Sequence, residues 1–242
     1  MDQLELCDAI VTATDALAEV ARRAPDVVVP SCPAWDVRQL AFHVGSVHRM
    51  ATSLVGDAVQ DAAGLAGLFV RPDSDEDPVA WVEVGAAALV DVLRAADPGA
   101  PVFTFWPPTQ MSFWARRMAH ETVIHRWDAQ AAVGPPDPIA GELAVSGVEE
   151  LLQKIDGDPR VGEIAPEPAT VHLHATDVPG EWLLTFTPSG LTVDRAHAKG
   201  DVAVRAGASD LDLLLSGRLD AGSVEAFGDR DLLGHLLAIS PI

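Results

Sequence analysis

The chain has 242 residues, 48% of them apolar, which is enough for one large domain or two ordinary ones with true hydrophobic cores. Its 36 acidic and 16 basic residues give a formal net charge of -20 at pH 7, and such an acidic surface repels phosphate backbones and anionic lipids. No basic segment followed by an apolar run opens the sequence, and no stretch reaches the roughly 18 apolar residues of a membrane span, so we expect a cytoplasmic protein with neither nucleic acid nor membrane as a partner.

Helical periodicity dominates the first 158 residues. Apolar residues recur at helical spacing in four long segments, and Pro- or Gly-rich breaks end them. The predicted helices cover residues 4–22, 35–55, 79–96 and about 110–133, with a turn over 29–34 and a long surface connection over 56–78. Four long amphipathic helices form a bundle. A fifth helix is expected near 140–155, and we assign 1–158 to this helical domain.

From residue 170 onward the apolar periodicity changes from about 3.6 to about 2, which indicates strands. Three strands, over 171–175, 182–186 and 191–193, predict an antiparallel meander, and 201–206 adds a fourth. Two helices follow, over 211–216 with Ser209 as the cap and over 232–238 after Asp229. The predicted fold class is α+β, a four-helix bundle followed by a small mixed α/β domain over 159–242 with an antiparallel sheet.

The two cysteines, Cys7 and Cys32, belong to no CxxC or repeated spacing. A cytosolic chain keeps its thiols reduced, so a disulfide is not expected. We interpret both as small buried apolar residues rather than as nucleophiles or metal ligands.

Glu121 and His125 stand four residues apart on a predicted helix. Their side chains project from one face about 6 Å apart along the axis, close enough to share one ion. A third ligand must come from a neighbouring helix, as in the metal sites of helical bundles. His43 is the best donor, because it lies on the apolar side of the second helix, where an unpaired imidazole is costly. The plain alternative is an exposed i,i+4 contact, which is common by chance.

The other histidines are less suited to this site. His48 is rotated by about 140° from His43, so we leave it out. His120 is turned about 100° from the neighbouring glutamate, and either supports the site from behind or points into its mouth. His172 and His174 share one strand face, but no third ligand is evident nearby, so we interpret them as ordinary strand histidines.

Four tryptophans lie in or near the segments that carry the candidate ligands. Aromatic side chains often line small-molecule sites. We assign Trp35 and Trp127 to the core, and keep Trp106 and Trp114 as substrate-binding candidates because a Pro-rich loop precedes the site helix. Core packing remains the alternative for these two.

Several segments look like signatures of one family. They are CPAWDVRQLAFHV at 32–44, ETVIHRWD at 121–128, and the shorter segments 171–177, 198–205, 216–219 and 227–229. Together they resemble the mycothiol-dependent maleylpyruvate isomerase family of actinobacteria, over nearly the whole chain. The resemblance implies a DinB-like four-helix metal-binding domain, a sterol-carrier-like C-terminal domain, and zinc ligands at His43, Glu121 and His125.

The resemblance also implies mycothiol as a thiol cosubstrate. Three protein ligands leave a position open on the divalent ion, for which zinc is the leading candidate and nickel, manganese or iron are alternatives. Because a cation stabilises a bound thiolate, the reaction needs no protein cysteine. We expect thiolate attack on a small electrophile, giving an S-conjugate in a transferase or a rotated product in a maleylpyruvate-type cis-trans isomerase.

The family's isomerase is thought to hold a substrate carboxylate with an arginine of its C-terminal domain. Arg205 and Arg218 are the candidates here, with a surface ion pair as the alternative for each. Two other functions stay open: a carrier or sequestering protein with a structural metal, and a thiol-independent hydrolase that uses metal-bound water. The protein is expected to be a monomer or a homodimer.

Overall fold

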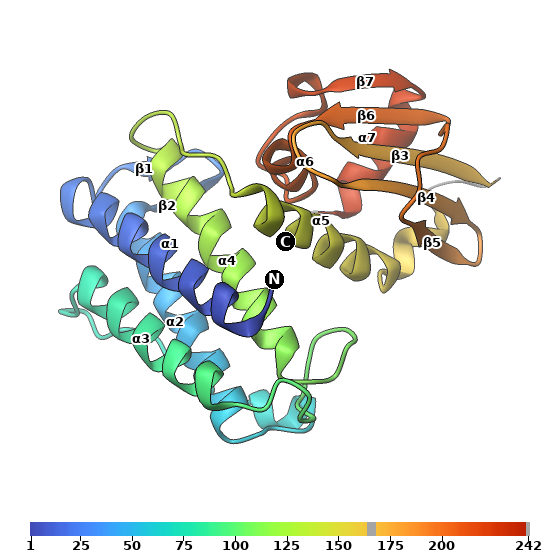
Figure 1. Cartoon of the computed structure of the whole chain (residues 1–242). Helices are drawn as coiled ribbons and strands as arrows, with labels where there is room; N and C mark the ends of the chain where they lie inside the picture. Colours follow the sequence, from blue (N-terminus) through green and yellow to red (C-terminus); the bar gives the residue numbers. More distant parts are fainter. Residues whose placement is uncertain (164–167, 241–242) are drawn as a thin grey trace. The chain divides into compact units, whose positions relative to one another are not determined.

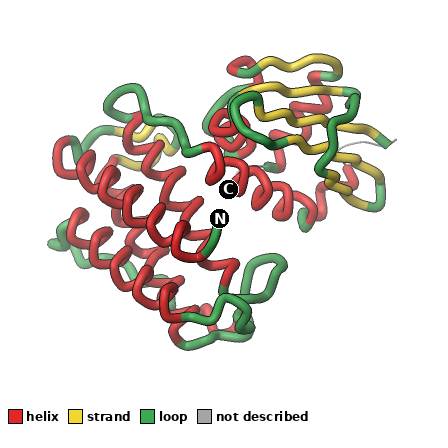
Figure 2. Tube along the Cα trace, viewed as in Figure 1, coloured by secondary structure: helices red, strands yellow, loops and turns green. Residues whose placement is uncertain are grey.

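The computed structural model describes residues 1–163 and 168–240 and divides the chain into two compact units. The first unit, Met1–Asp137, is mainly helical, and the second, Pro138–Ile242, carries a sheet (Figure 2). Helix α5 (Gly141–Asp156) belongs to the second unit, where it packs against helix α6 and strand β5. This division differs from the sequence-based boundary after residue 158, because the partners of the fifth helix follow it in the chain.

The first unit is the expected four-helix bundle (Figure 1). Its elements are α1 (Gln3–Arg23), β1 (Val28–Val29), β2 (Cys32–Asp36), α2 (Val37–Gly56), the 3-10 turn η1 (Ala62–Leu65), α3 (Pro78–Ala95) and α4 (Ser112–Ala131). Helices α1 and α2 each pack against both α3 and α4. The segment expected as a plain turn over 29–34 is instead part of the short antiparallel β1–β2 hairpin.

The start of α2 is specified by a capping box. Asp36 is the N-cap residue, and one of its carboxylate oxygens accepts a hydrogen bond from the backbone N–H of Gln39 at 2.8 Å. The Gln39 side-chain oxygen accepts in return from the backbone N–H of Asp36 at 3.0 Å. The first turn of α2 is thereby fixed, and with it the direction of His43, two turns into the helix.

Helices α2 and α3 approach each other closely at two glycines. A Cβ atom at Gly45 would lie 2.4 Å from Cδ1 of Trp81, and one at Gly85 would lie 3.0 Å from the carbonyl oxygen of Gly45. Any side chain at these positions would separate the helices. The core of the bundle beside this contact is aliphatic, with Leu17, Val20, Leu40, Val44 and Val82 buried together.

The second unit is a five-stranded sheet with helices (Figure 1). Besides α5 it contains η2 (Pro159–Glu163), β3 (Ala169–Ala175), β4 (Glu181–Thr187), β5 (Gly190–Asp194), β6 (Val202–Ala206), α6 (Ala208–Leu215), η3 (Ala221–Ser223), β7 (Glu225–Gly228) and α7 (Arg230–Ile239). The sheet order is β5-β4-β3-β6-β7. The meander β3–β4–β5 is antiparallel as predicted.

The sheet as a whole is mixed rather than antiparallel. Strand β6 pairs in parallel with β3, because the connection over 195–201 returns to the far edge of β3 instead of turning beside β5. Strand β7 then pairs antiparallel with β6. The sequence did not predict β7, whose four residues are mostly exposed and show no strong apolar alternation.

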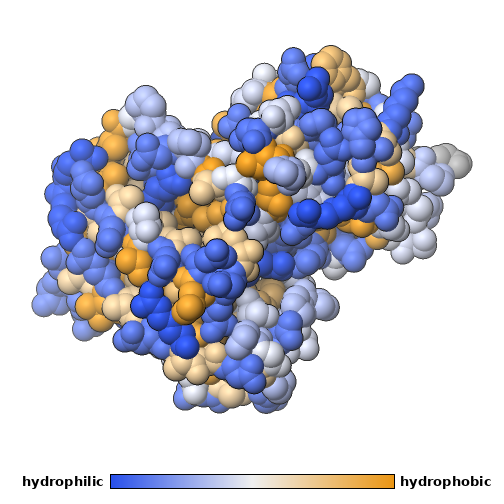
Figure 3. All heavy atoms as spheres, viewed as in Figure 1, coloured by the Kyte–Doolittle hydropathy of each residue, from blue (hydrophilic) through white to orange (hydrophobic). Residues whose placement is uncertain are grey.

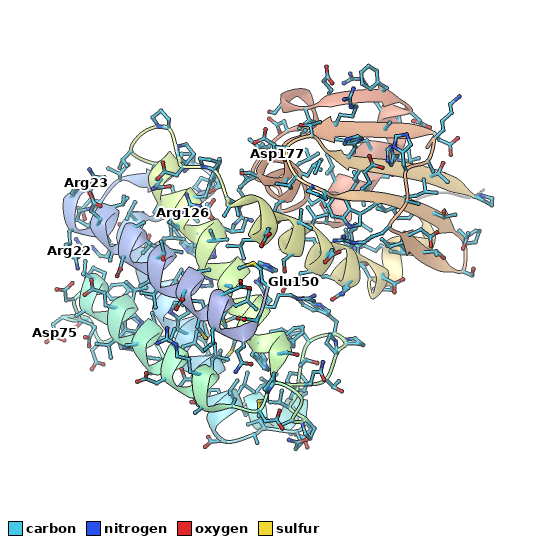
Figure 4. All side chains as sticks on the ribbon, in the orientation of Figure 1. Arg22, Arg23, Asp75, Arg126, Glu150 and Asp177 are labelled. Carbon is cyan, nitrogen blue, oxygen red and sulfur yellow. The ribbon has the colours of Figure 1, made fainter. Side chains whose placement is uncertain are left out.

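The cap of α6 also differs from the prediction. Ser209 lies inside the helix, and its Oγ accepts a hydrogen bond from the backbone N–H of Ile139 at 3.0 Å. The backbone N–H of Ala208 donates instead to Asp177, labelled in Figure 4, at 2.9 Å. The predicted cap of α7 is confirmed, since the Asp229 carboxylate accepts from two backbone N–H groups at the helix start.

Hydrophilic residues cover most of the face drawn in Figure 3, as the acidic composition requires. Among residues 1–163 and 168–240, no helix is both long enough and apolar enough to span a bilayer.

Candidate metal centre

Helices α2 and α4 bring His43, Glu121 and His125 together. One potential ligand atom from each residue lies within 4.8 Å of the other two. Nε2 of His43 is 3.1 Å from Oε1 of Glu121, and Nε2 of His125 is 3.2 Å from the same oxygen. The two imidazole rings meet edge to face, with centroids 5.1 Å apart. Two nitrogens and one oxygen therefore converge on one point in the bundle wall.

Partners behind these side chains select which atoms face that point. Nδ1 of His125 lies 2.9 Å from Oδ2 of the fully buried Asp128, whose other oxygen accepts from Ser31 Oγ at 2.6 Å. A proton on Nδ1 satisfies Asp128 and leaves Nε2 with a lone pair. Arg117 pairs with Oε2 of Glu121, which leaves Oε1 for the histidines. Such orienting contacts are typical of metal ligands.

The electrostatics of the site favour a positive charge. Burial acts to raise the pKa of Glu121, but Arg117 and then His125 hold that pKa well below its usual range. Burial acts to lower the pKa of His125, but Glu121 and Asp128 outweigh it and raise that pKa to about 9. Without another cation, the proton on His125 supplies this charge. A divalent ion fits the same donors, because imidazole and carboxylate suit zinc and its neighbours.

The point of convergence is accessible from the His43 side. The His43 side chain is 26% exposed, whereas those of Glu121 and His125 are 10% and 8% exposed. The ring of Trp35 packs on His43 with centroids 4.7 Å apart. Trp35 was assigned to the core; it packs there, and it also forms a wall beside a candidate ligand.

The two tryptophans kept as substrate-binding candidates differ in burial. Trp114 is fully buried, and its Nε1 donates to the carbonyl oxygen of Phe103 at 2.8 Å, so it fills the core. Trp106 is partly buried and packs against Phe105 and Phe113. Trp114 is therefore a core residue, which was the stated alternative to substrate binding.

The histidines beside the site are buried. His48 is fully buried, and its Nε2 lies 2.8 Å from Thr122 Oγ1. Because the Thr122 hydroxyl donates to the carbonyl oxygen of Met118 at 2.6 Å, it accepts from His48. Burial lowers the pKa of His48 to about 4, so it is a neutral core residue. His120 is also buried on α4. Neither belongs to the converging set.

Both candidate arginines belong to the second unit. Arg205, on β6, is exposed and stands beside His174 of β3 in the parallel register. Arg218 closes the turn after α6: its backbone N–H donates to the carbonyl of Leu213 at 2.8 Å, and its guanidinium donates to the carbonyl of Ser216 at 2.7 Å.

One prediction about the remaining histidines is wrong. His172 and His174 do have further candidate ligands nearby, because β4 supplies Glu181 and the 195–201 connection supplies His197. Beside His43, Glu121 and His125, the residues Arg117 and Asp128 were not predicted from the sequence. Their spacing was the available signal, since they stand four residues before Glu121 and three after His125.

Comparison with known families agrees with this organisation. The family model of the mycothiol maleylpyruvate isomerase N-terminal domain matches residues 7–130, and that of the C-terminal (MDMPI) domain matches 142–235. The chain belongs to the mycothiol maleylpyruvate isomerase family. No curated protein sequence matches it at a significant level.

Solved structures show the fold of this family. The chain is similar to the crystal structure of the mycothiol-dependent maleylpyruvate isomerase, with 16% identity, 93% of each chain covered and a TM-score of 0.63. It is equally similar to a histidine-to-alanine mutant of that enzyme, with 16% identity, 93% of each chain covered and a TM-score of 0.62. At 16% identity, this similarity shows that the chain shares the mixed α and β fold of these structures.

Proposed function

We propose that this member of the family is a metal-dependent enzyme that uses mycothiol to act on a small electrophile, as a maleylpyruvate-type cis-trans isomerase or a thiol S-transferase. The observation that carries the proposal is the convergence of His43, Glu121 and His125 on one point, with Asp128 and Arg117 behind them. Family membership supports the choice of mycothiol and of the reaction class.

In this proposal the three side chains hold a divalent ion, with zinc the first choice for two imidazoles and a carboxylate. Such an ion, with an open position, stabilises a bound thiolate relative to the thiol at neutral pH. Asp128 keeps His125 in the tautomer that presents Nε2, and Arg117 keeps Glu121 ionised. Trp35 excludes water from one side of His43.

Cys7 does not supply the thiol of this proposal. Cys7 is fully buried on α1, and burial raises the pKa of its thiol. A buried, protonated thiol is a poor nucleophile. A soluble thiol that reaches the His43 side therefore fits the site better than Cys7 does.

A substrate carboxylate requires a cationic partner, and Arg205 is the better of the two candidates. Its side chain is exposed on β6, whereas the guanidinium of Arg218 is engaged by the carbonyl of Ser216. We expect Arg205→Ala to raise KM more than it lowers kcat, and Arg218→Ala to act mainly on stability.

The decisive experiment measures turnover of maleylpyruvate by zinc-loaded protein with and without mycothiol, together with calorimetric titration of mycothiol. Wild type is compared with Glu121→Gln and with the matched control Glu142→Gln, which alters an exposed glutamate of α5. We expect thiol binding in wild type and control, and its loss in Glu121→Gln.

Each contrary outcome identifies another function. Hydrolytic turnover of an ester or amide without thiol would replace the proposal by a metal-dependent hydrolase. Metal binding without thiol binding or turnover would replace it by a carrier or sequestering protein with a structural metal. S-conjugate formation without isomerisation would keep the proposal and select the transferase from its two reactions.

A further inference from the structure

A second group of metal-binding side chains lies within the second unit, on the sheet. Three histidines and one glutamate each offer a ligand atom, and these atoms all lie within 4.8 Å of one another. The four residues are His172, His174, Glu181 and His197. We call them the sheet cluster.

Strand register explains how the sheet cluster forms. His172 and His174 alternate along β3 and so point to the same face of the sheet. Glu181 begins β4 directly opposite His174 in the antiparallel pair. His197 comes from the connection between β5 and β6. Donors from three separate segments thus meet on one face.

The donor atoms have spacings that suit one small cation. Glu181 Oε1 lies 3.0 Å from Nδ1 of His174, and Oε2 lies 2.9 Å from Nδ1 of His197 and 3.8 Å from Nε2 of His172. Zinc–nitrogen bonds of about 2.0–2.1 Å in a tetrahedron place neighbouring ligand atoms about 3.3 Å apart. The three nitrogen–oxygen distances, which run to the two oxygens of Glu181, bracket that value, and one ligand atom of each residue lies within 4.8 Å of the other three.

One buried nitrogen of the cluster lacks a hydrogen bond. His172 is 6% exposed, and its Nε2 has no hydrogen-bond partner among the described residues. That atom faces Glu181 Oε2 across the 3.8 Å gap. Glu181 already faces His174 and His197, so the protein alone leaves His172 unsatisfied, at a cost in free energy. An ion between the four side chains would satisfy it.

The sheet cluster is open to solvent on one side. His174, Glu181 and His197 line a depression of about 410 Å³, and the His197 side chain is 79% exposed. An ion can therefore reach the cluster without unfolding of the sheet. His197 is the ligand that closes the site, because it lies on the connecting segment rather than on a strand.

We propose that His172, His174, Glu181 and His197 form a second metal site, which binds one divalent ion of the zinc type with three nitrogens and one oxygen. Four protein ligands complete a tetrahedron, which is the pattern of a structural site. The ion would fix the 195–201 connection to β3 and β4. This proposal is independent of the function proposed for the α2–α4 site.

The test counts metal sites in the full-length protein. Metal-stripped protein is titrated with cobalt(II) and zinc(II), in wild type and in His43→Ala/His125→Ala, which removes two ligands of the α2–α4 site. We expect two bound equivalents in wild type and one in the double variant. The cobalt spectrum of the remaining site should show the strong visible bands of tetrahedral coordination.

Substitutions in the sheet cluster identify that remaining ion. His197→Gln in the double variant removes one of the four proposed ligands, so it should weaken zinc binding by more than about 100-fold, the upper end of the loss for a residue that only orients a ligand. His235→Ala, which alters an exposed histidine on α7, should leave zinc binding unchanged. His197→Gln alters an exposed side chain, so the fold should persist, which circular dichroism checks. The proposal is overturned if the double variant binds no zinc, or if its zinc is held equally tightly after His197→Gln.

Discussion

The Nδ1 atom of His125 lies 2.9 Å from a carboxylate oxygen of Asp128, and no part of that aspartate reaches solvent. The contact joins positions three residues apart on α4, so the helix itself fixes it. Ser31 holds the other oxygen of Asp128. The hydroxyl of Ser31, in the β1–β2 turn, thus holds the carboxylate that keeps Nδ1 of His125 turned away from Glu121.

Replacing Asp128 by asparagine should weaken metal binding without displacing a ligand. The amide keeps the shape but loses the charge that fixes the His125 tautomer, and such changes typically reduce metal affinity about 10- to 100-fold. Competition with a zinc-binding dye measures the effect. Asp91→Asn, which alters an exposed residue of α3, is the control and should match wild type. Equal affinities for Asp128→Asn and wild type would remove Asp128 from the site.

Replacing Arg117 by methionine should destabilise the protein strongly. The Arg117–Glu121 pair is about nine-tenths buried on both sides, and the variant leaves the buried Glu121 carboxylate with only the two histidines to offset its charge. Removal of one partner of a buried ion pair costs about 3–5 kcal/mol. Arg94→Met is the matched control, because its pair with Asp8 is exposed and should contribute no more than about 1 kcal/mol. Urea unfolding of metal-free protein measures both. Similar losses of unfolding free energy in the two variants would contradict the burial of the Arg117–Glu121 pair.

Metal affinity should rise with pH up to about 9. The folded pKa of His125, about 9, lies above the value of about 6.5 in unfolded chains. Protonated His125 therefore stabilises the metal-free fold fully below pH 6.5, and this contribution is lost as the pH rises through 9. Metal must displace that proton, so affinity should increase about tenfold per pH unit below 9.

Calorimetry in two buffers of different ionisation enthalpy counts the released protons. At pH 7.5 we expect about one proton more from wild type than from His125→Ala at the first site. Measurement in a His197→Gln background isolates that site from the sheet cluster. Equal proton release by the two proteins would show that His125 is already neutral before metal binds.

Periodicity predicted the helices of the bundle and the meander, because both are local patterns of apolar residues. The convergence of Glu121 and His125 also follows from local helix spacing. His43 could be predicted as their partner because an imidazole on the apolar face of a helix is unusual. The partners Arg117 and Asp128 have the same helical spacing, but a polar side chain on a helix is usually read as solvated.

The sheet cluster could not be predicted from the sequence, for a different reason. His172 and His174 show the right alternation, but Glu181 and His197 become their neighbours only through the β3–β4 register and the return of the 195–201 connection. The same return makes β6 parallel to β3 and the sheet mixed. Non-local pairing of this kind leaves no periodic signal in the sequence.

The close approach of α2 and α3 gives a last prediction. Gly45→Ala places a methyl group where Trp81 Cδ1 lies 2.4 Å away, so the helices must separate, at a cost of about 1–3 kcal/mol in unfolding free energy. Gly234→Ala, on α7, meets no atom within 4 Å and should instead stabilise by about 0.4–1 kcal/mol. Urea denaturation compares the unfolding free energies of the two variants.

Because His43 precedes Gly45 by two residues on the same helix, Gly45→Ala should also weaken metal binding, whereas Gly234→Ala should not. If Gly45→Ala has the same free energy of unfolding as wild type, α2 and α3 do not meet closely at this glycine.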